Sequence, residues 1–155
     1  MPDSSASQPD PDSFGFLVGD VARLIRAELD RRISAAGLGV TPGEGRALAH
    51  AARAGSVRQS VLAERMGVEA MTLSGYIDRL ESRGLVERHV DPGDRRAKLV
   101  VLTDAAAEVL FAIRAIAASV RADLSRDMDP ADWAMLQTLL KSVRQRLGSQ
   151  GGLAN

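Results

Sequence analysis

The sequence predicts a mainly α-helical protein that contains one β-hairpin, with its elements in the order α-α-α-α-β-β-α-α. Two observations support this fold class. Apolar residues recur at helical spacing over most of the chain, whereas strand-like sequence is confined to residues 85–102. Glycine, proline and helix-capping residues separate these stretches, so each one is expected to form its own short element.

The first helix is predicted over residues 14–36, where Gly37 and Gly39 end it. Its apolar residues at helical spacing are Leu17, Val21, Leu24, Ile25 and Ile33. The second helix begins at Thr41-Pro42-Gly43-Glu44, because threonine can cap, proline suits the first helical position and Glu44 stands where a capping box requires it. This helix is expected to end at about Ala54.

The next two helices are short and closely spaced. The first of them covers about residues 57–66, and Gly67 follows as a left-handed stop. The second begins near Glu69 and ends at Gly84. Its inward-facing residues are expected to be Leu73, Tyr76, Ile77 and Leu80.

The hairpin is predicted from residues 85–90 and 97–102, which flank a Pro-Gly turn within the charged segment 91–96 (DPGDRR). Two further helices follow, one opened by Thr103-Asp104 and the other capped at Asp129-Pro130. The last helix carries the apolar residues Trp133, Leu136, Leu140, Val143 and Leu147. This stripe fits either the core of one chain or an interface between two chains.

Composition sets limits on the class of protein. The 155 residues suit one domain, the formal net charge is zero, and residues 58–98 contain eight basic and seven acidic residues. Any binding of a polyanion must therefore come from local placement of charge. The absence of cysteine excludes disulfides and thiolate metal sites. Without a signal peptide or an apolar run of membrane-spanning length, a cytoplasmic location is expected.

Two adjacent helices followed by an arginine-tipped hairpin form an arrangement that can read duplex DNA, with one helix in the major groove and the cationic tip beside it. Three segments are similar to the MarR family of bacterial transcription regulators. They are residues 62–68 (LAERMGV), residues 76–88 (YIDRLESRGLVER) and the block DRRA at 94–97 with Leu99 and Leu102-Thr103. Thr41-Pro42 and Asp129-Pro130 also fall where the family begins its second and sixth helices.

The resemblance covers roughly residues 14–147 and implies a winged helix-turn-helix protein. It implies a single domain over 14–147, with a DNA-reading head at about 41–103 and dimerisation helices at about 14–36 and 104–147. Residues 1–13 and 148–155 are expected to be flexible tails by composition. The resemblance further implies a homodimer on double-stranded DNA with a pseudo-palindromic operator, often released by a small aromatic or phenolic molecule.

In the recognition helix, the residues placed to meet DNA are Met71, Thr72, Ser74, Gly75 and Arg79. Arg79 could instead pair with Asp78 or Glu81 on a solvated face. Gly75 departs from the family, which commonly has a larger residue there. Either the helix backbone approaches DNA more closely at this position, or direct readout is thinner.

In the wing, the resemblance implies that Arg96 enters the minor groove and that Asp94 holds it by an ion pair. A narrow minor groove attracts arginine because it concentrates negative potential. Arg95 is expected to contact a phosphate or to be simply exposed, and a solvated charged turn is the alternative for Arg96 as well. Arg58, Gln59 and Ser60 stand at a helix N-terminus that favours phosphates, although Ser60 could instead satisfy local backbone groups.

The residues Arg46 and His50, four positions apart on the second helix, could meet an anionic ligand, although an exposed arginine and a hydrogen-bonded histidine would look the same. No nucleophile elbow, phosphate loop or metal-ligand cluster is present, so no enzyme, cofactor or metal is expected. The alternative to a DNA-binding regulator is a winged-helix module for protein interaction that has weak or no DNA reading.

Overall fold

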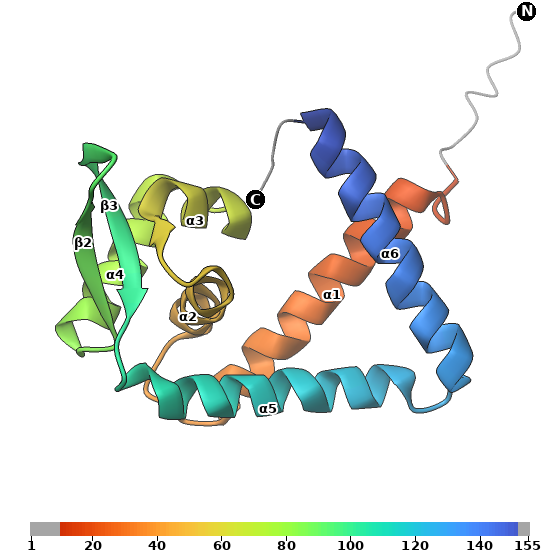
Figure 1. Cartoon of the computed structure of the whole chain (residues 1–155). Coiled ribbons are helices and arrows are strands. Elements are labelled where there is room, and N and C mark those ends of the chain that lie inside the picture. Colours follow the sequence, from red (N-terminus) through yellow and green to blue (C-terminus); the bar gives the residue numbers. More distant parts are fainter. Residues whose placement is uncertain (1–9, 152–155) are drawn as a thin grey trace, which may run out of the picture. The chain divides into compact units, whose positions relative to one another are not determined.

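The computed structural model describes residues 10–151 (Figure 1). Its elements are α1 (Phe14–Ala35), α2 (Pro42–Ala54), β1 (Val57–Arg58), α3 (Gln59–Met66), α4 (Ala70–Ser82), β2 (Val86–Asp91), β3 (Asp94–Leu102), α5 (Ala106–Ser125) and α6 (Pro130–Gly151). The predicted order of helices and hairpin strands is confirmed, with one short strand added. The chain forms two compact units, one up to Ala117 and one from Ala118.

Helix α2 begins with the capping box that the sequence predicts. The Thr41 side chain accepts a hydrogen bond from the Glu44 N–H, and the Glu44 carboxylate accepts one from the Thr41 N–H at 2.9 Å. Two of the N–H groups that lack helical partners are thus satisfied by side chains. Glu44 is almost fully buried, so this cap is part of the interior of the head.

The strand β1 corrects the prediction that the third helix starts at residue 57. Val57 and Arg58 pair with Val100 and Leu99, so the sheet has three antiparallel strands in the order β1-β3-β2. A two-residue strand has no periodicity of its own, and it forms because the edge of β3 offers unpaired backbone groups. Helix α3 therefore begins only at Gln59.

The left-handed turn at Gly67, with φ +63°, separates α3 from α4. The N–H groups of Gly67 and Val68 return to carbonyls in the last turn of α3, which ends that helix. The two helices together form the helix-turn-helix. Helix α4 lies within the predicted range of 69–84, and Leu73, Ile77 and Leu80 are buried as expected.

The core of the head is built from α2, α3, α4, the sheet and the first turns of α5. Its fully buried large side chains are Leu48, Leu62, Leu73, Ile77, Leu80, Val86 and Val100. A Cβ at Gly43 would lie 2.4 Å from the Tyr76 ring, so any other residue there would require that ring to shift. The contact of Tyr76 with the first turn of α2 fixes α4 against that helix.

Helices α1 and α6 leave large apolar side chains exposed. On α1 these are Phe14, Phe16, Leu17, Val18, Val21 and Leu24. On α6 they are Met135, Leu136, Leu139, Leu140 and Leu147. None of the helices between residues 10 and 151 combines the length and apolar character that crossing a membrane requires.

The ends of the chain differ in part from the predicted tails. Helix α6 continues to Gly151, so residues 148–151 are helical where a flexible tail was predicted. The glycine at position 148 lies inside this helix and does not end it. Residues 1–9 and 152–155, which carry the rest of the two predicted tails, lie outside the described residues.

Candidate nucleic-acid interface

The hairpin of β2 and β3 ends in an irregular tip. Val90 pairs with Lys98, whereas the next residue, Asp91, pairs with Asp94. Strand β3 therefore carries three extra residues at the tip, Arg95 to Ala97, which have no partners on β2. The turn is held by the Asp91 carboxylate, which accepts a hydrogen bond from the Gly93 N–H at 2.8 Å. The sequence predicted that the second strand begins at 97, but it begins at Asp94.

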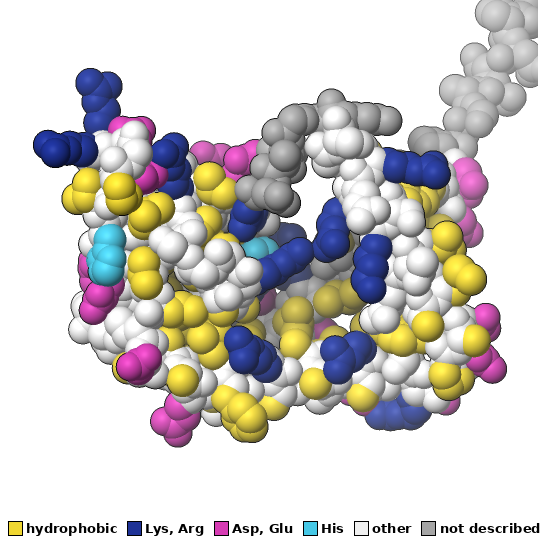
Figure 2. All heavy atoms as spheres, in the orientation of Figure 1, with side chains coloured by type: hydrophobic (Ala, Val, Ile, Leu, Met, Phe, Trp, Pro, Cys, Tyr) yellow, Lys and Arg dark blue, Asp and Glu magenta, His cyan; other side chains and the backbone are white. Residues whose placement is uncertain are grey.

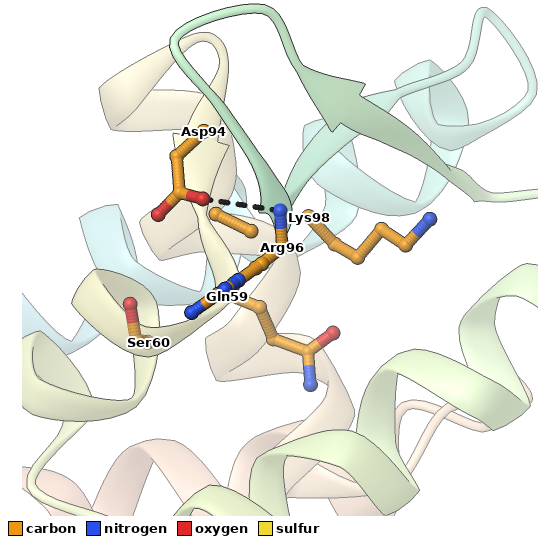
Figure 3. Close-up of a pocket in the computed structure, with 6 residues that line it drawn as sticks. Gln59, Ser60, Asp94, Arg96 and Lys98 are labelled. Atoms are coloured by element: carbon orange, nitrogen blue, oxygen red, sulfur yellow. Dashed lines mark hydrogen bonds between the residues drawn. The ribbon is translucent and has the colours of Figure 1, made fainter.

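In the described part of the chain, the Asp94 carboxylate on the wing is hydrogen-bonded to the backbone and not to a guanidinium group. Its Oδ1 accepts a hydrogen bond from the Arg96 N–H at 3.1 Å (Figure 3). Within residues 10–151 Asp94 and Arg96 form no ion pair, in contrast to what the resemblance implies. A carboxylate reaches an N–H two residues ahead at little entropic cost, whereas an ion pair would immobilise the long arginine side chain.

A pocket of about 380 Å³ lies between the wing and the start of α3. It is lined by Gln59, Ser60, Asp94, Arg96, Ala97 and Lys98. In Figure 3 the Arg96 side chain extends toward the start of α3, while that of Lys98 is directed the other way. The structure thus brings together two groups of predicted DNA-contacting residues, those of the wing and those of α3.

At the start of α3, two of the three predicted phosphate contacts have intramolecular partners. Arg58 Nε lies 2.5 Å from Asp91 Oδ2, which ties β1 to the wing turn. The Gln59 side chain accepts a hydrogen bond from Arg88 at 3.0 Å. Ser60 is exposed and has no side-chain hydrogen bond with any residue in 10–151. Of the three, Ser60 is the side chain most available to an external phosphate.

Arg79 pairs with neither of the acidic neighbours that the sequence offered as alternatives. Its Nε donates to Glu44 Oε1 at 2.5 Å, and its guanidinium lies 5.6 Å from the centre of the Tyr76 ring. Burial raises the pKa of Glu44, but the hydrogen bonds from Arg79 and Thr41 outweigh it, so the pKa of this carboxyl is lowered overall. Arg79 remains about half exposed, so its outer nitrogen atoms still face solvent.

The other predicted residues of the recognition helix differ in exposure. Met71 is 88 % exposed and Thr72 is also exposed, while Ser74 and Gly75 are partly buried. Gly75 lies on the same face as Thr72 and Arg79, at helical spacing. A Cβ added at Gly75 would meet only Arg79 Nη1, at an ordinary distance of 3.5 Å. Intramolecular packing therefore does not require glycine at this position.

Replacing Gly75 with alanine should raise the free energy of unfolding by about 1 kcal/mol, since alanine is the better helix former and space is available. We expect the same change to weaken binding to DNA, because the methyl group would project from the face of α4 that also carries Thr72 and Arg79. Chemical denaturation and a DNA titration would measure the two effects. Gly19→Ala is the matched control for the stability effect: it also removes a glycine in open space within a helix, and it should stabilise the protein to a similar extent. If Gly75→Ala left the affinity for DNA unchanged, this would instead show that α4 makes few direct contacts with the bases.

The sequence did not assign a role to Arg88, although it stands in the segment that resembles the family. Arg88 contacts Gln59, Ser74, Asp78 and Glu81. Burial lowers the pKa of Arg88, but Asp78 and Glu81 raise it more, so the guanidinium stays charged. One signal was available in the sequence. Arg88 follows the buried Val86 by two residues on the same strand, and residues two apart share a face, so Arg88 is predicted on the inner face of the sheet.

The near-neutral charge of the head is unevenly distributed, because within residues 10–151 several of its carboxylates are ion-paired while the cations of the wing are not. Three carboxylates are ion-paired internally: Asp91 pairs with Arg58, and Asp78 and Glu81 share Arg88, whose charge offsets one of the two. By contrast, the wing cations Arg95, Arg96 and Lys98 form no ion pair with any residue in 10–151. Figure 2 shows basic side chains projecting at the end of the hairpin. Positive charge is therefore concentrated at the tip.

The two predicted ligand-binding residues have different surroundings. Arg46 is ion-paired with Asp30 of α1, so it is not a free cation. The pKa of His50 is lowered, first by burial and then by the charges of Arg53, Arg46, Arg65 and Arg26. His50 is therefore neutral at pH 7 in cationic surroundings. Among the described residues, no group of three or more potential metal ligands comes together.

The folded protein should lose stability as the pH falls. Glu44, Asp91 and His50 all have lowered pKa values, so the unfolded chain takes up protons more readily and acid favours unfolding. The His50 contribution should fade as the pH falls below its ordinary pKa of 6.5, and those of the carboxylates below 4.5 and 3.8. Thermal melts between pH 8 and pH 3 would measure this. A midpoint that rises on acidification would contradict it.

A helix-turn-helix packed on a three-stranded sheet, with an arginine-bearing hairpin beside it, defines a winged-helix DNA-binding fold. Residues 40–98 match the MarR family. The transcriptional regulator PA3341 is 42 % identical, with a TM-score of 0.73 over 88 % of this chain and 98 % of that one. MarR from E. coli in its apo form is 26 % identical, with a TM-score of 0.71 over 84 % of this chain and 95 % of that one. A mutant of E. coli MarR complexed with operator DNA is 26 % identical, with a TM-score of 0.65 over 83 % and 91 %.

The fold, the matched segment and the similar structures agree. The chain belongs to the MarR family of transcriptional regulators.

Proposed function

We propose that this regulator binds a pseudo-palindromic operator as a homodimer and represses transcription from it. Helix α4 would enter the major groove through Met71, Thr72, Ser74 and Gly75, and the wing would place Arg96 in the adjacent minor groove. The observation that carries the proposal is the unpaired positive charge of Arg95, Arg96 and Lys98 on the wing, next to the start of α3 in the helix-turn-helix. The E. coli relative complexed with operator DNA supports it.

The partner in the homodimer is a second copy of this chain. Helices α1 and α6 each expose a row of large apolar side chains, as in Leu17, Val21 and Leu24 on the first and Leu136, Leu140 and Leu147 on the second. A helix that exposes a row of large apolar side chains is typical of an interface. A two-fold dimer presents two α4 helices and two wings to half-sites whose centres lie about 10 bp apart, or a multiple of that.

We further propose that a small aromatic anion binds next to His50 and thereby regulates DNA binding. A neutral histidine among Arg26, Arg53 and Arg65 favours a carboxylate or phenolate group, since none of these three arginines has an ion-pair partner in 10–151. Benzoate is a suitable probe. It should raise the melting temperature of the wild-type protein and should do so less in His50→Ala.

The test of DNA binding is a gel-shift titration with the DNA upstream of the protein's own gene, carried out at two salt concentrations. We expect a site-specific complex whose affinity falls as salt rises, because cation–phosphate contacts release counterions. Light scattering on the same sample should give the mass of a dimer. A folded dimer that forms no site-specific complex at low salt would overturn the proposal and would favour a module for protein interaction.

A further inference from the structure

We infer that Arg88 is the positioning residue that holds the recognition helix against the wing, and that it supports operator binding without touching DNA. The inference rests on the proposed operator binding. Arg88 belongs to strand β2, yet every hydrogen bond and ion pair that its side chain makes within residues 10–151 is with α3 or α4.

The Arg88 guanidinium donates hydrogen bonds from all three of its nitrogen atoms. Nε donates to the Gln59 side chain at 3.0 Å, Nη1 to Glu81 at 2.7 Å and Nη2 to Asp78 at 2.6 Å. A longer contact of 3.4 Å joins Nη2 to the carbonyl of Ser74. Glu81 also accepts a hydrogen bond from the Arg88 backbone N–H at 3.1 Å, so this carboxylate binds both the backbone and the side chain of Arg88.

The sheet explains why Arg88 reaches both helices. Arg88 pairs with Val100, and Val100 pairs on its other side with Val57, two residues before Gln59. Side chains directly opposite one another share a face of the sheet, so Arg88 emerges on the same face as the fully buried Val100. Its side chain is only 18 % exposed, which leaves it turned toward α3 and α4 rather than toward solvent.

The network also governs the charge of α4. Asp78 and Glu81 are about two-thirds and two-fifths exposed, and both would be free carboxylates on the proposed recognition helix if Arg88 were absent. Like charges repel, so the unshielded pair would oppose binding. Arg88 thus acts in two ways: it fixes the position of α4, and it cancels part of the negative charge of α4. Lysine would supply the charge without the fork, since its ammonium is a point charge on a flexible stem.

The experiment is a double-mutant cycle on operator affinity. Arg88→Ala should weaken binding roughly tenfold in the wild-type background. The same substitution should cost much less in an Asp78→Asn/Glu81→Gln background, because no carboxylates remain to be shielded or held. Arg88→Lys should recover part of the affinity. Arg95→Ala is the matched control, and its effect should be the same in both backgrounds.

Each other outcome overturns the inference. An equal loss in both backgrounds would show that Arg88 contacts DNA directly, and a lower melting temperature with unchanged affinity of the folded protein would show a structural role alone. If Arg88→Ala does not fold, Glu81→Gln replaces it: the ratio of operator affinity to affinity for unrelated DNA should fall, and an unchanged ratio would overturn the inference. Wild-type protein that binds no operator would refute the proposed function itself.

Discussion

Replacing Arg96 with alanine is expected to weaken operator binding by about 1–3 kcal/mol, the range typical of an arginine that contacts DNA. The Arg96 guanidinium has no ion-pair partner in the described residues, so it is free to enter a narrow minor groove where negative potential is concentrated. No intramolecular ion pair has to be broken first. Fluorescence anisotropy with a labelled operator, at fixed salt concentration, would measure the loss.

The control for Arg96 is its neighbour Arg95, which has the same charge on the same irregular tip. Arg95→Ala should weaken binding about equally on operator and on unrelated DNA, as expected of a phosphate contact, whereas Arg96→Ala should affect A·T-rich operators most. Neither variant should change the melting temperature noticeably, because both side chains are exposed. Unchanged affinity of Arg96→Ala would remove the wing from the mechanism.

Replacing Glu44 with alanine should lower the free energy of unfolding by about 1–3 kcal/mol, since it removes two hydrogen bonds to a buried carboxylate. The Thr41 N–H would lose its partner at the start of α2, and Arg79 would lose the anchor that joins α4 to α2. The loss should stay below the value for a fully buried ion pair, because Arg79 is about half exposed and can be hydrated again. Urea denaturation would measure it.

Two variants make the Glu44 prediction specific. Glu44→Gln keeps the size and one acceptor oxygen, so it should cost less than alanine. Glu64→Ala removes an exposed glutamate of α3 and should change stability by no more than about 0.5 kcal/mol. Equal effects of Glu44→Ala and Glu64→Ala would contradict a structural role for the shared carboxylate.

The fold was predictable where the cause of an element lies within a few residues. The capping box at Thr41 and Glu44, the stop at Gly67 and the apolar face of α4 were all predicted and are confirmed. The strand β1 was not, because a two-residue strand is formed by its partner rather than by its own sequence. The start of β3 was placed three residues late, since charged residues at a turn resemble a loop until the register of the hairpin is known.

The candidate site was less predictable, because its side chains find partners far away along the chain. Arg58 pairs with Asp91 at a separation of 33 residues, and Arg79 with Glu44 at a separation of 35. Two carboxylates lie nearer to Arg79 in the sequence, those of Asp78 and Glu81. Both lie on the side of α4 that faces β2, where they pair with Arg88. Which carboxylate meets which arginine is decided by the packing of α2, α4 and the sheet.

The three unpaired residues at the start of β3 form the tip of the hairpin, and they are separate from the part of the hairpin that sets the register of its strands. The ladder from Val86 to Val90 sets the register of the strands, and the bulge begins only beyond it. Residues can therefore be inserted, deleted or exchanged at Arg95, Arg96 and Ala97 without shifting the alternation that buries Val86 and Val100. An exchange of side chains at the tip would thus change the charge that the wing presents while the body of the domain stays the same.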